Sequence, residues 1–265
     1  MMKSDSHMKI CKDCNTPTVS IINMLGRTFK VPIMCDCESK EYEKRKEEEI
    51  ALEQMQRLEK LRNHSLMDNK FYNCTFENFQ IDQSNKYMFD IGRKYVSNFD
   101  RAREENIGLM LFGPTGTGKT FIAFCIANEL INKLTPVIAI SSIGLLNKIK
   151  ETYGRYGNEG EVQIINSLKN ASLLILDDLG AENNTSWSKE KLYEIIDSRY
   201  RDGKPIIITP NLTRDQLRDK LTGDDGVYRT YDRIIEMCTP VEVKGKARRI
   251  EAAKAKQDII KEIFK

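Results

Sequence analysis

The 265-residue chain is 40% hydrophobic and 31% charged, a balance that is typical of a folded globular protein and excludes a disordered chain. Its formal net charge of +3 is too small to indicate nucleic-acid binding unless basic residues cluster locally. The sequence has neither a run of ~18 apolar residues nor the apolar core of a signal peptide, so we expect a cytoplasmic protein that does not associate with membranes.

The polar N-terminal segment MMKSDSHM ends in a second methionine, Met8, and we interpret residues 1–7 as an expression leader. Four of the seven cysteines follow as a C-x2-C and a C-x-C pair with about twenty residues between them, and a disulfide framework does not fit a reducing compartment. This spacing suits one tetrahedral Zn²⁺, which would fold a small structural module over residues 8–37. Reduced free thiols and a redox role are the alternatives. The predicted zinc ligands are Cys11, Cys14, Cys35 and Cys37.

Residues 38–63 are rich in Glu, Lys, Leu and Met and contain neither Gly nor Pro, which predicts one long exposed helix. The apolar residues of this segment recur mostly at three-residue steps and form one narrow stripe. We therefore expect residues 38–70 to be either a solvated linker helix or a docking helix for another protein.

From residue 71 onward the sequence has the pattern of a globular domain. The segment FYNCTFENFQ alternates aromatic and polar residues and is predicted to hold the preceding helix against this domain. Apolar strands such as GLMLF, SLLILDD and PIIIT then alternate with amphipathic helices. This alternation predicts an α/β fold over residues 71–256, in which helices cover both faces of a parallel sheet, followed by a tail at 257–265.

The octapeptide GPTGTGKT lies between an apolar strand and a helix and matches the pattern G-x-x-x-x-G-K-[ST] of nucleotide-binding P-loops. Its glycines allow backbone N–H groups to surround the β-phosphate of ATP at the positive end of the following helix. We expect Lys119 to neutralise the β- and γ-phosphate oxygens and Thr120 to bind Mg²⁺. The predicted ATP-binding residues of the loop are Gly113, Pro114, Thr115, Gly116, Thr117, Gly118, Lys119 and Thr120.

Another apolar strand ends in SLLILDDLGAE, about 57 residues after the P-loop. We expect Asp177 to hold the Mg²⁺ hydration shell, and Asp178 stands where many such ATPases carry the glutamate that orients the attacking water. Because the aspartate side chain is shorter, Glu182 is a rival for this catalytic role, unless it belongs to a solvated turn. A third strand, PIIITPNLT, carries Thr209 and Asn211 at its tip, where a polar side chain can reach the γ-phosphate or the water.

The segment RTYDRIIEMC places Arg229 and Arg233 four residues apart on one helical face. Arginine reaches phosphates across a gap, either within its own chain or from a neighbouring subunit. A surface ion pair with Asp232 or Glu236 is the alternative for these arginines. The later segment KGKARR adds two further arginines near the end of the fold.

Taken together, GPTGTGKT, LLILDDLGAE, ITPNLT, RTYDRIIEMC and GKARR, in this order and spacing, resemble the AAA+ ATPases of the DnaC/DnaI helicase-loader group, whose core the IstB transposition ATPases share. The resemblance covers roughly residues 71–256 and the cysteine-bearing N-terminal segment. It implies that Arg233 is an arginine finger that contacts ATP in the adjacent subunit. It also implies that Arg249, or Arg248 one position earlier, is the second sensor. Asn211 matches the first sensor, although a proline precedes it where the family usually has Thr or Ser.

The resemblance further implies that two segments, KIKETYGRYG and ENNTSWSKEK, bind single-stranded DNA. Tyr153 in the first segment matches an aromatic DNA contact, and Thr185 and Trp187 in the second match polar and aromatic contacts. Aromatic faces stack on bases regardless of sequence, and Lys148, Lys150 and Arg155 can meet phosphates. Alternatively, Tyr153 and Trp187 are aromatic residues of the core or of an interface.

We therefore expect an ATP-dependent replication protein that loads the replicative helicase onto single-stranded DNA. It would bind ATP, Mg²⁺ and Zn²⁺, self-associate with ATP and grip the helicase through its zinc module. Its ATPase is expected to be slow and stimulated by DNA or the partner. Two alternatives remain open: an IstB-like transposition ATPase that acts on duplex DNA, and a nucleotide-regulated scaffold without relevant hydrolysis.

Overall fold

The computed structural model describes most of the chain, but the expected leader at 1–7 and the expected second sensor Arg249 lie outside the described residues. No helix within the described residues is long and apolar enough to cross a membrane. The chain separates into two compact units, residues 1–57 and residues 58–265. The described ranges are 9–155, 158–245, 247–248, 256–257, 260–261 and 263–264.

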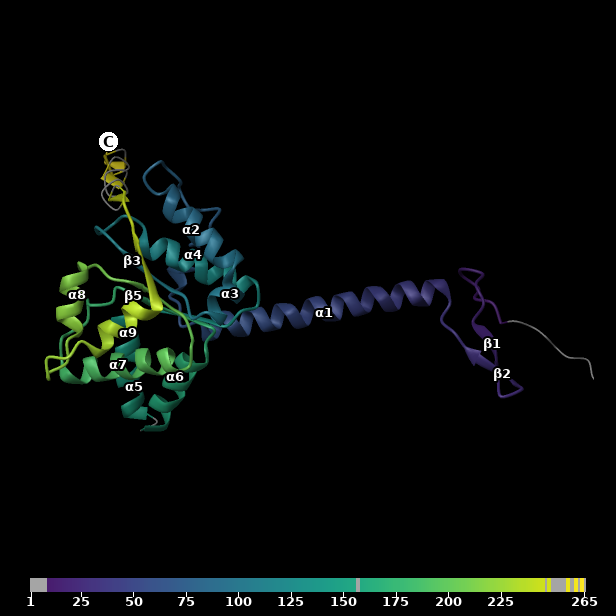
Figure 1. Cartoon of the computed structure of the whole chain (residues 1–265). Helices are drawn as coiled ribbons and strands as arrows, with labels where there is room; N and C mark the ends of the chain where they lie inside the picture. The colour runs from purple at the N-terminus through teal and green to yellow at the C-terminus, as the bar shows by residue number, and fades with distance from the viewer. Residues whose placement is uncertain are drawn as a thin grey trace, which may run out of the picture. The chain divides into compact units, whose positions relative to one another are not determined.

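The N-terminal unit contains a β-hairpin (Figure 1). Its strands β1 (Val19–Met24) and β2 (Arg27–Pro32) are antiparallel and pair along their full length. The two-residue turn between them, Leu25–Gly26, has positive φ angles of 50° and 73°, which is the backbone geometry of a tight hairpin. An isolated two-stranded hairpin is at best marginally stable in water, so this unit needs further contacts to stay folded.

A single 29-residue helix, α1 (Asp36–His64), follows the hairpin and confirms the long helix expected from residue 38 onward. At its start, the N–H group of Asp36 donates to Thr16 Oγ1 at 3.1 Å, and that of Cys35 donates to Glu38 Oε2 at 3.2 Å. These bonds satisfy N–H groups that have no partner within the helix. They explain why the helix begins slightly earlier than its composition predicts.

The second unit contains a parallel sheet, as the alternation of apolar strands and helices predicts. In the described part of the chain this sheet has five strands in the order β4-β5-β6-β3-β7, so the strand before the P-loop lies inside the sheet. The carboxyl ends of parallel strands meet at one edge, where ligands of such sheets bind. The strands are β3 (Gly108–Phe112), β4 (Val137–Ser141), β5 (Leu173–Asp177), β6 (Ile206–Thr209) and β7 (Cys238–Glu242).

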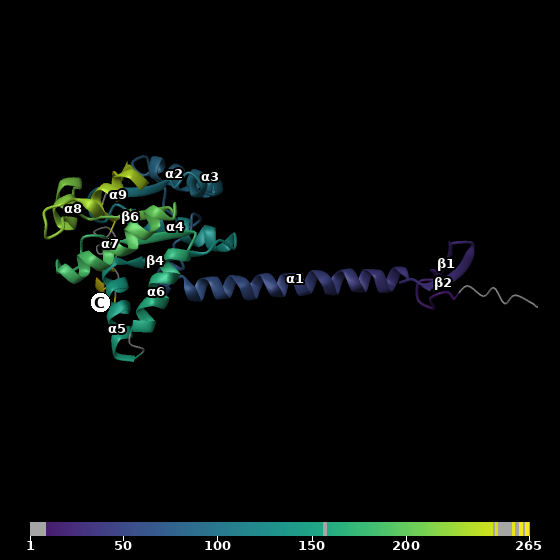
Figure 2. The same cartoon turned by 60° about the horizontal axis from the view of Figure 1, so that its bottom comes forward.

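Helices cover both faces of this sheet (Figures 1 and 2), which confirms the expected α/β fold. In β5, Leu173 and Ile175 join one core while Leu174 and Leu176 join the other, because successive strand residues point to opposite faces. The first core is completed by the 3₁₀ helix η1 (Asn69–Phe71), α2 (Lys86–Ser97), α3 (Phe99–Glu104) and α4 (Lys119–Asn132). The second core is completed by α5 (Ser142–Arg155), α6 (Asn158–Asn170), α7 (Ser186–Arg201), α8 (Arg214–Leu221) and α9 (Arg229–Met237).

The segment FYNCTFENFQ holds the end of α1 against the domain, as its aromatic pattern predicts. Asn128 of α4 donates from Nδ2 to the carbonyl oxygens of Phe71 and Cys74, at 2.9 and 2.8 Å. From the same segment, the Tyr72 hydroxyl donates to the carbonyl oxygen of Arg62 in α1 at 3.1 Å. The segment is therefore bonded both to the P-loop helix and to the end of the long helix.

One buried arginine fixes the C-terminal half of α7. Arg199 is fully buried, and its Nη1 donates to the carbonyl oxygens of Leu168 and Ala171 at 2.6 and 3.0 Å. Its Nη2 donates to the carbonyl oxygen of Pro205 at 2.7 Å. Burial lowers the pKa of Arg199 to about 10, so the guanidinium stays charged at neutral pH and suits the negative end of α6. These bonds set the position of α7 relative to α6 and β6.

Candidate nucleotide-binding site

The P-loop joins β3 to α4 through a backbone that only glycine adopts readily. Gly113 and Gly118 have φ angles of 144° and 97°. A Cβ atom on Gly113 would lie 2.3 Å from the carbonyl oxygen of Val243, so the loop passes too close to the segment after β7 to carry a side chain there. Pro114 and Thr115 form the exposed part of the loop. The first N–H groups of α4 follow directly and have no partners within the helix, which favours an anion at this end.

Lys119 lies within the P-loop and is only 4% exposed. Its Nζ donates to the carbonyl oxygens of Gly113 and Pro114 at 2.8 and 2.9 Å. Thr117 Oγ1 donates to the Pro114 carbonyl oxygen as well, at 2.9 Å. An ammonium group held against loop carbonyls is placed to exchange them for phosphate oxygens. This placement supports the expected role of Lys119.

The Asp177 carboxylate joins three elements at the carboxyl edge of the sheet. Thr120 Oγ1, in the first turn of α4, donates to Asp177 Oδ1 at 2.7 Å. Thr209 Oγ1, at the end of β6, donates to the same oxygen at 2.5 Å. Burial raises the pKa of the Asp177 carboxyl, and the two hydroxyl donors oppose this shift because they stabilise the charged form. A threonine hydroxyl beside a carboxylate is the kind of oxygen donor set that Mg²⁺ binds, so the residues present fit the expected metal.

Thr209 has a larger structural role than its sequence suggests. It is fully buried, and besides donating to Asp177 it accepts from the N–H group of Asp178 at 3.1 Å. Asp177 and Thr209 are register partners on neighbouring parallel strands, which explains how residues distant in sequence meet. The sequence predicts that Thr209 and Asn211 lie at the strand tip, and the resemblance assigns the sensor role to Asn211. Alignment of the last residues of successive apolar strands is the signal that would have found it.

Asp178 and Asn211 lie together just beyond the strand ends. Asn211 donates from Nδ2 to Oδ1 of Asp178. Asp178 has a positive φ of 53°, an uncommon conformation for a residue with a side chain, which turns the chain immediately after β5. The two residues that were expected to act on the γ-phosphate and the water are thus brought into direct contact.

Glu182 is not part of a solvated turn, and that alternative is wrong, because the residue is only 5% exposed. Its Oε2 accepts from Ser142 Oγ at 2.7 Å and from the N–H group of Gly180 at 2.9 Å. Ser142 Oγ also lies 3.1 Å from the carbonyl oxygen of Asp178. These bonds tie the loop after β5 to the start of α5 and favour a structural role for Glu182 over a role in orienting water.

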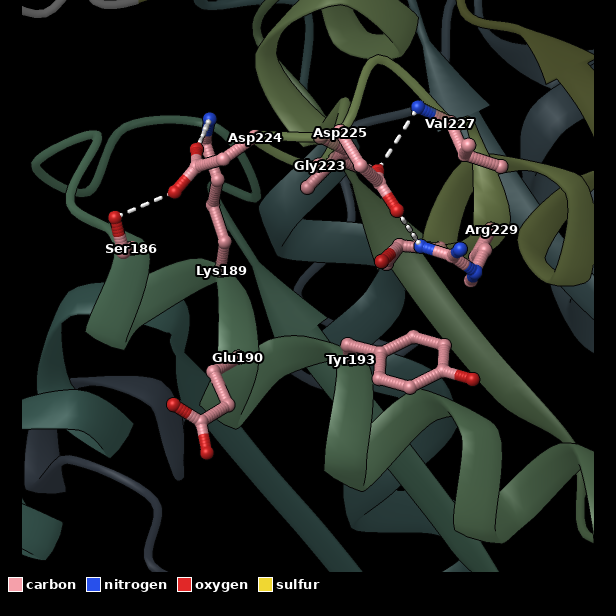
Figure 3. A pocket seen from close by; sticks show the side chains of 11 residues that line it. Ser186, Lys189, Glu190, Tyr193, Gly223, Asp224, Asp225, Val227 and Arg229 are labelled. Carbon is pink, nitrogen blue, oxygen red and sulfur yellow. Dashed lines mark hydrogen bonds and ion pairs between the residues drawn. The ribbon is translucent and has the colours of Figure 1, made fainter.

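The two arginines of α9 pair with acidic residues outside their own helix. Arg229 Nη1 contacts Asp225 Oδ2 at 2.5 Å, and Arg233 Nε contacts Asp197 Oδ1. Within the described residues, Arg229 and Arg233 form these ion pairs instead of the alternative pairs with Asp232 or Glu236. Arg229 and Asp225 help to line a pocket of about 360 Å³ between α7 and the loop that precedes α9. Figure 3 shows the contact between these two side chains.

The segment after β7 returns to the P-loop. The N–H group of Arg248 donates to the carbonyl oxygen of Gly116 at 3.1 Å, and its Nη2 contacts Asp82 Oδ2 at 2.9 Å. The resemblance implies Arg248 as the alternative second sensor to Arg249, and the backbone of Arg248 lies on the phosphate-binding loop. Its side chain lies against the segment that precedes α2.

The residues expected to contact DNA gather around the start of α7. Lys150 of α5 lies over the Trp187 ring, 4.7 Å from its centroid, and Trp187 packs partly against the core. Thr185 caps α7 by accepting from the N–H group of Ser188 at 3.1 Å. Tyr153 is 43% exposed on α5. Lys150, Thr185 and Trp187 line one pocket of about 100 Å³, so the structure brings these predicted residues together.

The four N-terminal cysteines converge on one point. Their Sγ atoms all lie within 4.8 Å of one another, and Cys35 is buried. The Sγ atom of Cys37 lies 3.1 Å from that of Cys35 and 3.5 Å from that of Cys11. Thiols at these separations fit a single tetrahedral ion with sulfur ligands. The cluster, which Cys14 completes, could therefore bind a metal and supply the stability that the hairpin lacks.

Thr209→Val removes one hydroxyl and keeps the side-chain volume. It is expected to lower the steady-state rate of ATP hydrolysis about tenfold, because Asp177 loses a donor and the N–H group of Asp178 loses its acceptor. The rate is measured across a Mg²⁺ titration in the presence of single-stranded DNA. Thr222→Val is the control, since Thr222 Oγ1 donates to the Arg218 carbonyl oxygen away from the site. A folded Thr209→Val protein with the wild-type rate would contradict this role.

Comparison with known proteins agrees with this geometry. The chain is 30% identical over 164 residues to the replicative helicase loader DnaC of Escherichia coli strain K12, which covers 61% of this chain and 63% of that protein. It is 25% identical over 207 residues to the replicative helicase loader DnaI of Bacillus subtilis strain 168, which covers 75% of this chain and 65% of that protein. Both matches therefore span less than two thirds of the relative's own length.

The fold has a solved counterpart. A crystal structure of the DnaC helicase loader matches with a TM-score of 0.55 and 26% identity, covering 67% of this chain and all of that chain. This likeness confirms the expected AAA+ fold. The sequence profile of the family described as IstB-like ATP binding protein matches residues 36–256, which is most of the chain. The chain belongs to the IstB-like ATP-binding protein family.

Proposed function

We propose that this protein is a cytoplasmic ATP-dependent loader that delivers a replicative helicase to single-stranded DNA. The observation that carries the ATP-dependent part is the Asp177 carboxylate, which accepts hydroxyl donors from both the P-loop helix and the neighbouring strand end. When a nucleotide binds to the P-loop, the hydrogen bonds of such a carboxylate change, and the change reaches the neighbouring strand through its second hydroxyl donor. The helicase part is supported by the two relatives, which are both named replicative helicase loaders.

We assign ATP hydrolysis to the same edge of the sheet. Asp178 is the group that orients water, because Asn211 holds its carboxylate just beyond the strand ends. Mg²⁺ held by Thr120 and Asp177 would neutralise phosphate charge. Arg233 lies on α9, a different helix from the one that follows the P-loop. It supplies the remaining positive charge to the ATP site of a neighbouring subunit. Turnover then depends on assembly and is slow without DNA or the partner.

Single-stranded DNA is proposed to lie along α5 and the start of α7. Tyr153 offers an exposed ring for base stacking, and Trp187 with Lys150 offers a ring and a cation in contact. The Thr185 hydroxyl is engaged in capping α7, so its contribution to DNA binding comes through the position of this helix end.

The N-terminal module, residues 8–37, is proposed to dock on the helicase. Four cysteines would hold one structural Zn²⁺ in a closed site with sulfur ligands only. The hairpin then presents apolar side chains to solvent: the cross-strand partners Ile22 and Phe29 are 41% and 47% exposed, and Leu25 in the turn is 100% exposed. Apolar residues grouped in this way mark a protein-interaction surface. The ATPase domain proposed for residues 71–256 would control when the docked helicase is released.

A second candidate function is an IstB-like transposition ATPase that acts on duplex DNA, which the matching family description favours. Fluorescence anisotropy with labelled single-stranded and duplex DNA, each with Mg²⁺ and a non-hydrolysable ATP analogue, separates the two candidates. The loader prefers the single strand, and the transposition ATPase prefers the duplex.

Capture of the purified replicative helicase from the same organism on the immobilised protein tests the loader function. Leu25→Glu is expected to weaken capture at least about tenfold, because the interface loses the burial of an apolar side chain and gains a charge. Affinity is measured by biolayer interferometry with ATP, with ADP and without nucleotide.

Val162→Glu is the matched control for this experiment, because Val162 is a similarly exposed apolar residue at 55% but lies on α6 in the other unit. It should bind the helicase like the wild-type protein. Failure of the wild-type protein to bind the helicase in every nucleotide state would overturn the loader function and favour transposition.

Metal analysis tests the proposed zinc site. The purified protein is expected to contain one Zn²⁺ per chain by mass spectrometry, and Cys35→Ser is expected to lose it because a structural site needs all four ligands. Cys125→Ala is the control, since Cys125 is buried in the core of the other unit. A wild-type protein that is free of zinc after purification under reducing conditions would refute the site.

A further inference from the structure

The two arginine–aspartate pairs of α9 are built differently. Arg229 pairs with Asp225 (Figure 3). The two side chains are 51% and 46% exposed. Arg233 pairs with Asp197 of α7, whose side chain is only 11% exposed. An exposed pair on a loop holds its members loosely, whereas a nearly buried carboxylate keeps its partner in one place. The geometry of Arg233 is therefore the better defined of the two.

Asp197 lies between two guanidinium groups. Its Oδ1 accepts from Nε of Arg233, and its Oδ2 accepts from Nε of Arg201 at 2.7 Å. Burial acts to raise the pKa of Asp197, but the two guanidinium groups outweigh it and hold this pKa below its usual value. The carboxylate is therefore ionised at neutral pH. A charged acceptor binds the Nε–H group more strongly than a neutral one.

Aromatic rings complete the contacts around Arg233. Its guanidinium lies 4.7 Å from the ring centroid of Tyr200 and 5.9 Å from that of Tyr193. The Tyr200 hydroxyl donates to Oε1 of Glu236, further along α9, at 2.9 Å. The rings limit the plane of the guanidinium, and the bond at Nε limits its rotation within that plane. Together the rings and the bond at Nε fix the orientation of the two terminal nitrogens, which are the atoms that bind a phosphate in a bidentate manner.

The helix that carries Asp197 is itself anchored. Two residues further along α7, Arg199 is bonded to three backbone carbonyl oxygens. Earlier in the same helix, Lys191 Nζ contacts Glu161 Oε1 of α6 at 2.6 Å, with 16% and 13% of the two side chains exposed. The carboxylate that holds Arg233 therefore belongs to a helix bonded at several points to the rest of the domain.

We propose that Asp197 is the positioning residue for the arginine finger: it holds Arg233 at Nε so that the terminal nitrogens reach the γ-phosphate of ATP in the neighbouring subunit. This inference rests on the proposed function, which makes Arg233 a finger that acts between subunits. Such an arginine stabilises the charge of the transition state most when its orientation is set before the reaction. Loss of Asp197 would therefore reduce catalysis and leave ATP binding in the neighbour's P-loop unchanged.

Asp197→Asn keeps the size of the side chain and removes the charge that orients Arg233. We expect kcat of the DNA-stimulated ATPase to fall about tenfold, while KM for ATP stays at the wild-type value. Asp225→Asn is the matched control and should keep the wild-type kcat. It removes the exposed partner of Arg229, which lies one helical turn before Arg233 on α9. Thermal unfolding by circular dichroism verifies that both variants are folded.

Mixed assemblies show whether the effect lies at the finger or at the variant's own site. Lys119→Ala subunits have a disabled P-loop and an intact arginine finger. Asp197→Asn subunits have an intact P-loop and an arginine finger that is no longer positioned. A mixture of the two is expected to hydrolyse ATP faster than either variant alone, because the first supplies a positioned finger to the P-loop of the second. Without such restoration, Asp197 would support its own subunit's site, and the proposal would be overturned.

Arg233→Ala separates failure of this inference from failure of the proposed function. The double variant Asp197→Asn/Arg233→Ala is expected to be no slower than Arg233→Ala alone, because Asp197 acts through Arg233. If Arg233→Ala keeps the full rate, the finger itself is refuted. If Arg233→Ala is slow and is restored by mixing with Lys119→Ala, but Asp197→Asn keeps the wild-type kcat, the finger stands and the positioning role of Asp197 is refuted.

Discussion

The candidate nucleotide site depends on the register of parallel strands that end together. Ser141, Asp177 and Thr209 are aligned across β4, β5 and β6. The Asp177 carboxylate can therefore accept from Thr209 on one side and from Thr120 of the P-loop helix on the other. A slip of one residue would turn Asp177 to the other face of the sheet and place either the apolar Leu176 or Asp178 in its position. Alternate residues of β5 are buried in opposite cores, so a slip would also exchange the side chains that fill both cores.

The helix α7 joins the two activities proposed for the ATPase domain. Trp187 lies near its start in contact with Lys150, and Asp197 lies near its end in contact with Arg233. Arg199 bonds the helix to the C-terminal end of α6 and to the residue before β6. Within the proposed function, the DNA contact and the arginine finger are therefore attached to one well-anchored helix. This arrangement would give the proposed stimulation of ATP hydrolysis by DNA a physical route through a single helix.

The sequence predicted those parts of the fold and site that depend on local pattern. The P-loop, the long helix and the alternation of strands and helices are visible within short windows, and Asp177 follows from its place at the end of an apolar strand. The roles of Thr209 and Asp197 depend on which strand or helix lies alongside, so no local motif marks them. The local sequence leaves Glu182 open between a catalytic residue and a solvated turn, because its buried position and its bond to Ser142, forty positions earlier in the chain, appear only in the folded structure. Tertiary partners of polar residues were therefore the least predictable part of the site.

If each ATP site is completed by a neighbouring subunit, the number of subunits in the assembly must depend on whether a nucleotide is bound. Sedimentation velocity of the wild-type protein with single-stranded DNA measures this directly, with Mg²⁺ and a non-hydrolysable ATP analogue and again without nucleotide. We expect a larger assembly with the analogue and single chains without it, and Lys119→Ala should remain as single chains in both conditions. A wild-type protein that sediments as single chains with and without the analogue would contradict a site completed between subunits.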